Sequence, residues 1–313
     1  RDFRQHRARA GRAMIALGFD TSNYTTSVAC FSQNGLRENA SRLLPVKPGA
    51  LGLRQSDAVF AHVNALPALC EEVLARMEEP PCAVGVSIFP RRVEGSYMPC
   101  FKVGELAARV LATERGIPCY TFSHQEGQLA AALVTTGHEA LFSGEFLAWH
   151  LSGGTTELLH VTPGLRAEKI GGTKDISAGQ LLDRTGVMLG LAFPAGAQLD
   201  AMARVRDRFS IRQDGLFFSL SGMENQVKAR LAHAAPEEIA GFVLCSVADI
   251  LARVTATAQK QFGALPVLVS GGVAGSRIVR ERLSGAMFCP PRFSSDNALG
   301  IAALAVRAFL KEN

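Results

Sequence analysis

Long hydrophobic runs and paired cysteine motifs are missing from this sequence. No apolar run approaches the roughly 20 residues that span a bilayer, and the arginine-rich start lacks the apolar stretch that follows it in a signal peptide. The 7 cysteines include no C-x-x-C pair, which is typical of reduced, structural thiols. We therefore expect a cytoplasmic protein with no membrane contact.

Net positive charge is also small outside the first 13 residues. The formal net charge is +5, but the segment RDFRQHRARAGRA holds five arginines and one aspartate, which leaves about +1 for the rest. The body of the chain is therefore not a nucleic-acid binder by bulk charge. A strand pattern starts at Met14, so we predict that residues 1–13 are a basic arm, disordered or non-native. Contact of this arm with RNA phosphates is the alternative.

What the chain does contain is a repeated strand-and-turn design. Hydrophobic residues make up 48% of it, as in folded globular proteins. Three segments each place an apolar strand before a turn of small and hydroxyl residues: 15–31, 146–161 and 265–283. The first two predict β-hairpins, and the third predicts a strand that enters a helix through a Gly-Gly turn.

Helical patterns separate these segments. Apolar residues recur at helical spacing in residues 56–79 and 103–116, and short strands are predicted at 83–89 and 118–122. The class is therefore α/β with two lobes. We predict an N-terminal lobe at residues 14–135 and a C-terminal lobe at 136–313. The second lobe contains a helical insertion at about 177–262 and a final helix at 296–311.

The glycine-rich turns offer groups that bind phosphate. Glycine lets the backbone approach an anion closely and aim N–H groups at it. One such turn is usually an ordinary hairpin, but three in one chain predict a nucleotide-binding cleft. In the second and third segments, we therefore predict that the turn residues bind a nucleotide: Ser152, Gly153, Gly154, Thr155, Gly271 and Gly272.

Acidic and histidine side chains provide candidate ligands. Asp20 ends the first strand and precedes Thr21, an arrangement that can hold Mg²⁺-bound phosphate, although turn capping is the simpler explanation for Asp20 alone. His124 and Gln128 share one helix face in SHQEGQLAAAL, where a second histidine would complete a metal pair. Asp296 starts the last helix, where acids also serve as N-caps; only pairing with His124 makes it a ligand. The other histidines show no ligand spacing and are predicted to be structural or exposed.

Seven motifs occur in the order typical of the tRNA threonylcarbamoyladenosine synthase family, formerly described as O-sialoglycoprotein endopeptidases. They are LGFDTSNYTTSVA, SHQEGQLAAAL, LSGGTTELLHV, SAGQLLDRTGVMLGLAFPAG, FFSLSGMENQV, LVSGGVAGSRIV and FSSDNALGIAALA. The chain resembles this family over residues 14–310, as a divergent paralogue. The resemblance implies a two-lobed sugar kinase/heat-shock chaperone/actin-like fold with a nucleotide cleft between the lobes.

The resemblance also implies a transferase. The family moves a threonylcarbamoyl group from its adenylate to the amino nitrogen of a tRNA adenosine, with a metal held by two histidines and an aspartate. His124 and Asp296 match metal ligands, for which Fe or Zn is expected and Mg is the alternative. Asp183 and Gly196 match residues that bind the adenosine portion of the donor. ATP or an acyl-adenylate is the implied ligand. The implied partners are tRNA and small proteins, with a dimer as a further alternative.

The departures from the family pattern cluster where chemistry would occur. Gln128 replaces the second histidine, and a neutral amide is a weaker donor to a transition metal than imidazole. Three further positions near the nucleotide differ from the family pattern: a histidine is replaced by Thr155, an acid by Gln180 and an asparagine by Ser276. We still predict that Thr155 and Ser276 bind the nucleotide. The longer loop PRRVEGSYMPC, residues 90–100, replaces a compact glycine turn.

Three functions stay open at this point. The first is an active threonylcarbamoyl transferase with metal coordination adjusted to His124, Asp296 and water or Gln128. The second is a nucleotide-binding paralogue that serves as a regulatory or scaffold subunit. The third is an ATPase or phosphotransferase, because the fold hosts several chemistries. Motif coverage favours the first.

Overall fold

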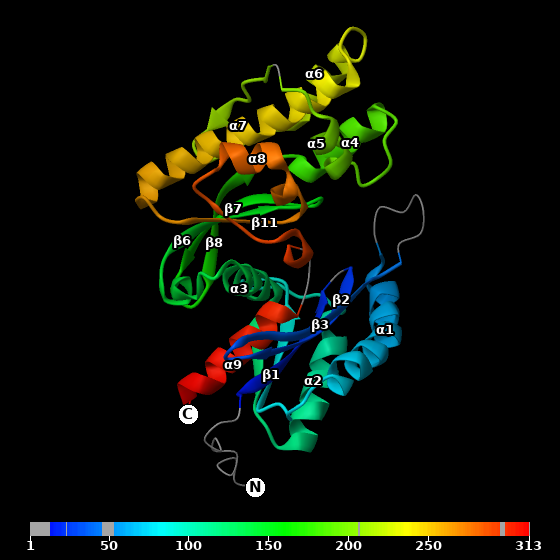
Figure 1. The fold of residues 1–313 in the computed structure, drawn as a ribbon, viewed down its shortest axis with the longest axis vertical. Helices are drawn as coiled ribbons and strands as arrows, with labels where there is room; N and C mark the ends of the chain where they lie inside the picture. The colour runs from blue at the N-terminus through cyan, green and yellow to red at the C-terminus, as the bar shows by residue number, and fades with distance from the viewer. Residues whose placement is uncertain (1–12, 23, 46–52, 206, 295–297, 313) are drawn as a thin grey trace. The chain divides into compact units, whose positions relative to one another are not determined.

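The computed structural model describes residues 13–22, 24–45, 53–205, 207–294 and 298–312. The chain divides into two units (Figure 1): unit 1 comprises residues 1–139 and 296–313, and unit 2 comprises residues 140–295. Each unit is described by itself. Residues 1–12 of the basic arm predicted at 1–13, and the predicted ligand Asp296, lie outside the described residues.

Unit 1 is built on a mixed five-stranded sheet in the order β3-β2-β1-β4-β5. The strands are β1 (Ile15–Ser22), β2 (Thr25–Ser32), β3 (Gly35–Leu43), β4 (Ala83–Phe89) and β5 (Cys119–Ser123). The first three run antiparallel, which confirms the predicted hairpin at residues 15–31, and β4 and β5 continue the sheet parallel to β1.

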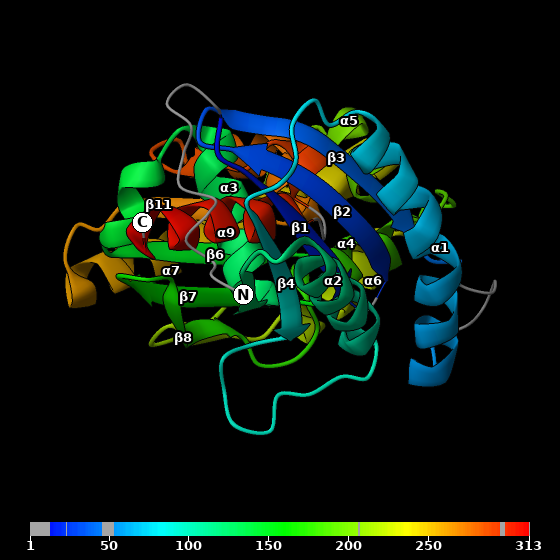
Figure 2. The same cartoon turned by 90° about the horizontal axis from the view of Figure 1, so that it is seen from below.

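Four helices cover the two faces of this sheet (Figures 1 and 2). On one face lie α1 (Gln55–Ala75) and α2 (Phe101–Arg115), and on the other lie α3 (His124–Thr136) and α9 (Leu299–Glu312). The predicted glycine stop of α2 is confirmed, because Gly116 takes the left-handed conformation that ends a helix. Pro67 lies inside α1.

The last helix differs from its predicted place in the C-terminal lobe, because α9 packs in unit 1. Glycines allow this approach. A Cβ on Gly18 of β1 would lie 2.5 Å from the carbonyl oxygen of Ala298, and one on Gly300 would lie 1.8 Å from the carbonyl oxygen of Gly127 in α3. The backbone of α9 therefore lies almost directly against β1 and α3, where larger side chains would not fit.

Unit 2 holds a seven-stranded sheet in the order β12-β11-β6-β7-β8-β10-β9. The strands are β6 (Phe146–Leu151), β7 (Thr156–Thr162), β8 (Arg166–Thr173), β9 (Gln213–Asp214), β10 (Phe217–Phe218), β11 (Val267–Ser270) and β12 (Met287–Phe288). The predicted hairpin at residues 146–161 is β6 and β7, which pair antiparallel. The predicted strand-to-helix segment is β11, which leads through a short 3-10 turn, η3 (Gly272–Gly275), into a helix.

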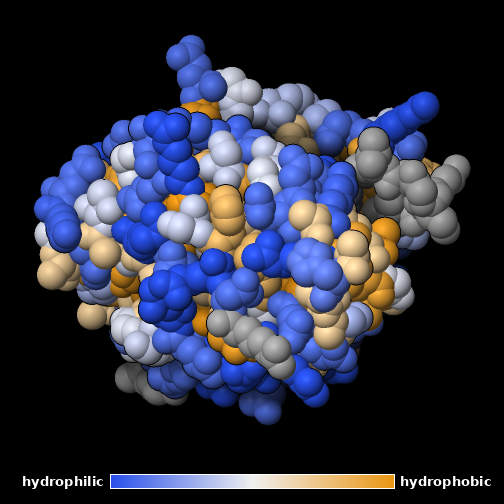
Figure 3. Space-filling view, turned by 90° about the horizontal axis from the view of Figure 1, so that it is seen from above, coloured by the Kyte–Doolittle hydropathy of each residue, from blue (hydrophilic) through white to orange (hydrophobic). Residues whose placement is uncertain are grey.

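Helices of unit 2 occupy the predicted helix-rich block and its surroundings. They are α4 (Ala178–Met188), α5 (Gly196–Met202), α6 (Ser221–Arg230), α7 (Pro236–Phe262) and α8 (Arg277–Arg282), with short 3-10 turns η2 (Glu139–Ser143), at the boundary between the units, and η4 (Pro291–Phe293). Seen from the side on which α6 and α7 lie in Figure 1, the surface is mostly hydrophilic, with apolar side chains in small groups (Figure 3).

Two described helices, α1 and α7, are long and apolar enough by composition to cross a membrane, although the sequence showed no comparable unbroken run. For α7 the core of unit 2 accounts for this hydropathy, because 78% of its most apolar window is buried inside the unit. Phe242, Leu244 and Leu251 of α7 are among the buried residues of that core.

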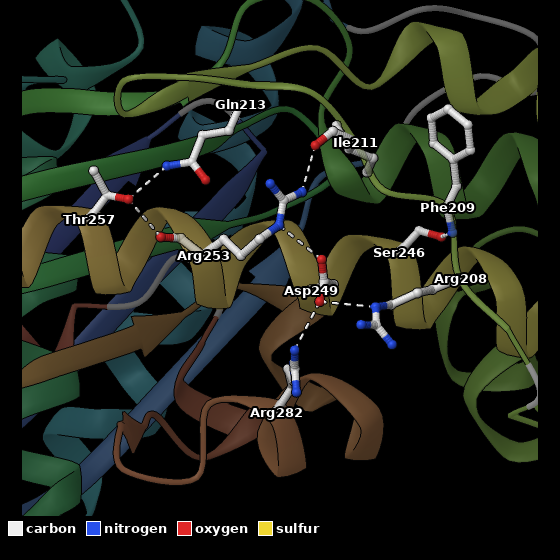
Figure 4. A network of polar contacts seen from close by, with 9 residues as sticks. All are labelled: Arg208, Phe209, Ile211, Gln213, Ser246, Asp249, Arg253, Thr257 and Arg282. Carbon is white, nitrogen blue, oxygen red and sulfur yellow. Dashed lines mark hydrogen bonds and ion pairs between the residues drawn. The ribbon is translucent and has the colours of Figure 1, made fainter.

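An ion cluster fastens the segment after α5 to α7 and α8 (Figure 4). The carboxylate of Asp249 in α7 forms ion pairs with three arginines. Its oxygens lie 3.1 Å from Nε of Arg208, 2.9 Å from Nε of Arg253 and 2.9 Å from an Nη of Arg282. Burial would raise the pKa of this carboxyl group, but the arginine hydrogen bonds and charges outweigh burial and hold the pKa below its ordinary value. Arg253 also donates to the carbonyl oxygen of Ile211.

Candidate active site

The polar residues of unit 1 gather at one edge of its sheet. The parallel strands β1, β4 and β5 end at Ser22, Phe89 and Ser123, and the carboxyl ends of parallel strands are the usual place for ligands in α/β sheets. His124 follows β5 directly and is the first residue of α3. The Ser123 hydroxyl and the Glu126 carboxylate form a capping box that holds this helix start.

Asp20 and His124 form a direct pair at this edge. Asp20 is fully buried, and its Oδ2 lies 2.6 Å from Nδ1 of His124. The other carboxylate oxygen, Oδ1, accepts the backbone N–H of Ser22 at 2.8 Å, so the carboxylate is fixed at both ends. A carboxylate on one ring nitrogen sets the tautomer and orientation of an imidazole and directs the other nitrogen, Nε2, toward a ligand or proton.

This pair was not predicted from sequence, which joined His124 to Asp296 instead. The signal was present: an acid that ends one strand and a histidine that follows another meet when both strands run parallel in one sheet. Only the strand order decides that β1 and β5 flank the same strand, β4.

Buried polar atoms without a protein partner occur on three elements of unit 1, β1, β4 and α1. Among the described residues, Ser22 Oγ, Ser87 Oγ and His62 Nε2 are buried and have no hydrogen-bond partner. Leaving such atoms unpaired is costly unless water or a ligand satisfies them. Together with Asp20, they make the edge of this sheet suitable for a polar ligand or ordered water.

His62 was predicted to be structural or exposed, and the structure buries it completely on α1. Its Nδ1 lies 2.8 Å from the Thr26 hydroxyl. Burial lowers the pKa of this imidazole to about 4, although the negative charge of Asp20 acts in the opposite direction. His62 is therefore neutral at pH 7.

Thr21, predicted to bind a nucleotide, uses its hydroxyl within unit 1. The side chain is fully buried, donates to the carbonyl oxygen of Cys100 at 2.9 Å and accepts the N–H of Gly104 at 3.1 Å. These bonds attach β1 to the first turns of α2. The neighbouring residue Asp20 is the one whose side chain faces His124.

Few of the described side chains at this site could bind a metal. Gln128 lies one turn after His124 on α3, while Asp296 is outside the described residues. In the part of the chain that the structure describes, no three His, Cys, Asp or Glu side chains come together. His124 supplies an imidazole already oriented by a carboxylate, which is how metal-binding histidines are usually held.

In unit 2 the predicted phosphate turn follows β6. Ser152 closes it, because its Oγ accepts the N–H groups of Gly154 at 3.3 Å and Thr155 at 3.0 Å. The start of α4 lies against the turn: Ser177 Oγ donates to the carbonyl oxygen of Gly153 at 2.7 Å. A Cβ on Gly179 would lie 2.5 Å from the carbonyl oxygen of Ser152, so this contact requires glycine.

The third turn lies beside the second. Strand β11 pairs parallel with β6, and a Cβ on Gly271 would lie 2.2 Å from the carbonyl oxygen of Leu151. Gly271 has a φ of 95°, in the region that favours glycine. The predicted turns at residues 152–155 and 271–272 therefore meet at one edge of the unit 2 sheet.

The remaining predicted residues of unit 2 form two local pairs. Asp183 of α4 accepts the N–H of Ala195 at 2.8 Å, which fixes the backbone just before Gly196 and the start of α5. Ser276 donates to Asp200 at 2.5 Å and caps α8. Asp183 and Gly196 are thus brought together. Ser276 is bound to Asp200, which was not predicted from sequence as a site residue.

Gln180, where the resemblance implies an acid, has a local role. It is the third residue of α4, and its side chain accepts the N–H of Ser177 at 3.3 Å to complete a capping box. A glutamate would cap the helix equally well. The change therefore removes a negative charge beside the 152–155 turn without disturbing the helix start.

Comparison with known proteins gives the family of the chain. Residues 56–303 match the model of the family described as tRNA N6-adenosine threonylcarbamoyltransferase. The chain belongs to this family. Proteins of that name from Streptococcus pneumoniae (strain Hungary19A-6) and Streptococcus suis (strain 05ZYH33) are each 33% identical to it. The alignments cover 95% and 96% of this chain and 93% and 94% of those proteins.

Solved structures support the fold. The (R)-2-hydroxyglutaryl-CoA dehydratase component A from Acidaminococcus fermentans has a TM-score of 0.55 at 18% identity, covering 94% of this chain and 98% of that one. A ROK family protein from Streptococcus pneumoniae TIGR4 has a TM-score of 0.55 at 11% identity, covering 96% and 99%. The predicted sugar kinase/heat-shock chaperone/actin-like fold class is thereby confirmed.

Proposed function

We propose that the chain is a threonylcarbamoyl transferase that modifies an adenosine of tRNA. One observation carries the proposal: a chain of this family places a buried carboxylate, Asp20, on the first histidine of its metal helix, His124, at 2.6 Å. In the reaction, a bond forms between the adenosine amino nitrogen and the carbamoyl carbon. The bond from that carbon to the phosphate oxygen breaks, AMP leaves, and the nitrogen loses a proton.

His124 is the central residue of the proposed metal site. We assign Nε2 as its ligating atom, because Asp20 holds Nδ1, and we add Asp296 and the Gln128 amide as further ligands. A divalent metal there, Fe or Zn with Mg as the alternative, would act as a Lewis acid toward the donor. Asp20 keeps the imidazole oriented with or without the metal.

The donor, an acyl-adenylate or ATP, is assigned to the glycine turns and the α4–α5 region of unit 2. Support comes from the adjacency of the turns at residues 152–155 and 271–272 and from the Asp183 contact beside Gly196. Ser276 belongs to this set through the cap of α8. In unit 1, Asp20 and Thr21 remain nucleotide-binding proposals, although the hydroxyl of Thr21 already donates one hydrogen bond and accepts another.

The acceptor of the threonylcarbamoyl group is tRNA. We place the protein in the cytoplasm without a membrane contact. Small partner proteins or a second copy of the chain are further partners. Exposed apolar side chains on α1 and α2 support a protein contact in unit 1: Phe60, Val63, Leu106 and Val110.

A second function is favoured by Gln128. An amide is a weaker ligand for Fe or Zn than imidazole, so the chain would then be a nucleotide-binding paralogue with a regulatory or scaffold role. An ATPase or phosphotransferase activity is the third candidate. ATP turnover without tRNA that disappears in Asp20→Ala would support it.

Metal content separates these functions. We expect about one Fe or Zn per wild-type chain and none in His124→Ala, because removal of the imidazole leaves no strong donor on α3. Gln128→His is expected to raise the metal affinity at least about tenfold, since it completes a two-histidine pair at helical spacing. The measurements are elemental analysis and chelator competition, with His160→Ala in unit 2 as the matched control.

Activity is measured as transfer of labelled threonylcarbamoyl to tRNA. Transfer that is lost in His124→Ala and retained in His160→Ala supports the proposal. A wild-type protein with neither metal nor transfer, but with tight nucleotide binding, would leave the regulatory paralogue as the function. Deletion of the gene should abolish the tRNA modification where no second family member is encoded.

A further inference from the structure

The loop between β4 and α2 forms a pocket on unit 1. The pocket has a volume of about 450 Å³ and is lined by Phe89 together with residues 91–97. Small-molecule sites in proteins typically measure about 300–1,000 Å³, and the volume of this pocket lies within that range. This loop, residues 90–100, is the longer segment that replaces the compact turn of the family.

The loop is attached to the helix that carries His124. The N–H of Gln125 donates to the carbonyl oxygen of Pro90 at 3.0 Å. Arg92 forms a two-point ion pair with Glu126, from Nε and Nη2 at 3.2 Å each. Both contacts involve the first turn of α3, so the pocket is anchored within two residues of His124.

The loop also has internal order. The N–H of Arg91 donates to the Ser96 hydroxyl at 3.0 Å, and the N–H of Ser96 donates to the carbonyl oxygen of Val93 at 3.2 Å. Gly95 has a φ of 75°, which glycine adopts without strain. The lining side chains are therefore presented from a defined turn.

The lining combines aromatic rings with guanidinium groups. Tyr97 is 61% exposed, which is high for a large aromatic side chain. Arg92 lies over the ring of Phe89, with its guanidinium carbon 5.8 Å from the ring centroid. Aromatic side chains stack with unpaired bases, and arginines pair with phosphates. The one acid in the lining, Glu94, can accept from an exocyclic amino group.

We propose that this pocket binds one unstacked nucleotide of the acceptor RNA, adjacent to the adenosine that receives the threonylcarbamoyl group. Tyr97 stacks on the base. The inference rests on the proposed function, because that function supplies the RNA and places the reacting adenosine near His124. A free nucleotide offers the same chemistry from a second source.

The test is equilibrium binding of a labelled anticodon stem-loop RNA to the full chain at several salt concentrations. We expect Tyr97→Ala to weaken binding about tenfold or more, since a stacked base contributes on that order, while Tyr97→Phe retains the ring and the affinity.

Val93→Ala is the matched control, because Val93 lines the same pocket, is 63% exposed and carries neither ring nor charge. Equal affinity in Tyr97→Ala and Val93→Ala would overturn the inference. So would AMP that binds to wild type but not to Tyr97→Ala and leaves the affinity of wild type for the RNA unchanged, since the pocket then serves a free nucleotide. A circular dichroism spectrum checks that each variant is folded.

Kinetics distinguish failure of this inference from failure of the proposed function. The inference predicts that Tyr97→Ala raises the KM for tRNA in the transfer assay and leaves kcat near the wild-type value. Transfer with an unchanged KM overturns the inference and leaves the proposed function standing. RNA binding that depends on Tyr97 in a chain with no transfer activity supports the pocket and overturns the proposed function.

Discussion

His62 makes the stability of unit 1 depend on pH in a range where most carboxylates do not titrate. The imidazole is fully buried on α1, with Nδ1 near the Thr26 hydroxyl and Nε2 unpaired among the described residues. Burial lowers its pKa from 6.5 to about 4. The unfolded chain therefore binds a proton at this residue at higher pH than the folded chain does, and acidification favours unfolding.

The magnitude follows from the two pKa values. Each difference of one between them corresponds to about 1.4 kcal/mol, so the full effect is about 3 kcal/mol. Stability is intact above pH 6.5, decreases as the pH falls below it, and has lost the full amount near pH 4. Between pH 7 and pH 5 the free energy of unfolding should fall by about 2 kcal/mol, a large share of a typical domain stability.

Urea unfolding of wild type, His62→Gln and the exposed control His138→Gln at pH 7 and pH 5 tests this. The chain has 1 tryptophan, Trp149, which is buried in unit 2, so its fluorescence reports that unit while circular dichroism reports both. The pH effect should appear in the circular dichroism transition and not in the fluorescence transition. It should vanish in His62→Gln and persist in His138→Gln. Equal loss of stability in wild type and His62→Gln would refute the reasoning.

Two further changes address the packing of each unit. Asp249→Asn leaves three arginines around a neutral amide and should destabilise unit 2 by about 1–3 kcal/mol, read from Trp149 fluorescence in urea. Asp207→Asn, which breaks one exposed pair, should cost less than about 1 kcal/mol, and equal effects would show that the cluster adds nothing. Gly300→Ala puts a Cβ where the carbonyl oxygen of Gly127 lies and should lower the thermal midpoint of unit 1. The control Gly222→Ala meets nothing within 4 Å and should leave the midpoint unchanged or raise it, so a stable Gly300→Ala would contradict the close packing of α9.

The periodic parts of the chain were predictable from sequence because local forces dominate them. The hairpin at residues 15–31 places a turn of small and polar residues between two short apolar runs, and Gly116 ends α2 by a left-handed conformation that glycine favours. His124 and Gln128 were placed correctly on one helix, and a capping box of Ser123 and Glu126 forms its start.

Relations between distant segments were not predictable in the same way. An apolar helix near the end of the chain gives no indication of which sheet it covers. For that reason α9 was predicted in the C-terminal lobe, whereas it packs in unit 1. The pairing of Asp20 with His124 joins residues 104 positions apart. It depends on β1 and β5 flanking the same strand, which is a property of the sheet and of no local pattern.

The sequence by itself determined the family, the fold class, most of the helices and strands, and the residue types available for chemistry. Each of these depends on motif order or on interactions between near neighbours along the chain. The tertiary structure decided which side chains meet: Asp20 with His124, the turn at 152–155 with Gly271, and the 90–100 loop with the first turn of α3. These contacts arise from strand order and from glycines that permit close approach, and both act across distances that a linear pattern does not encode.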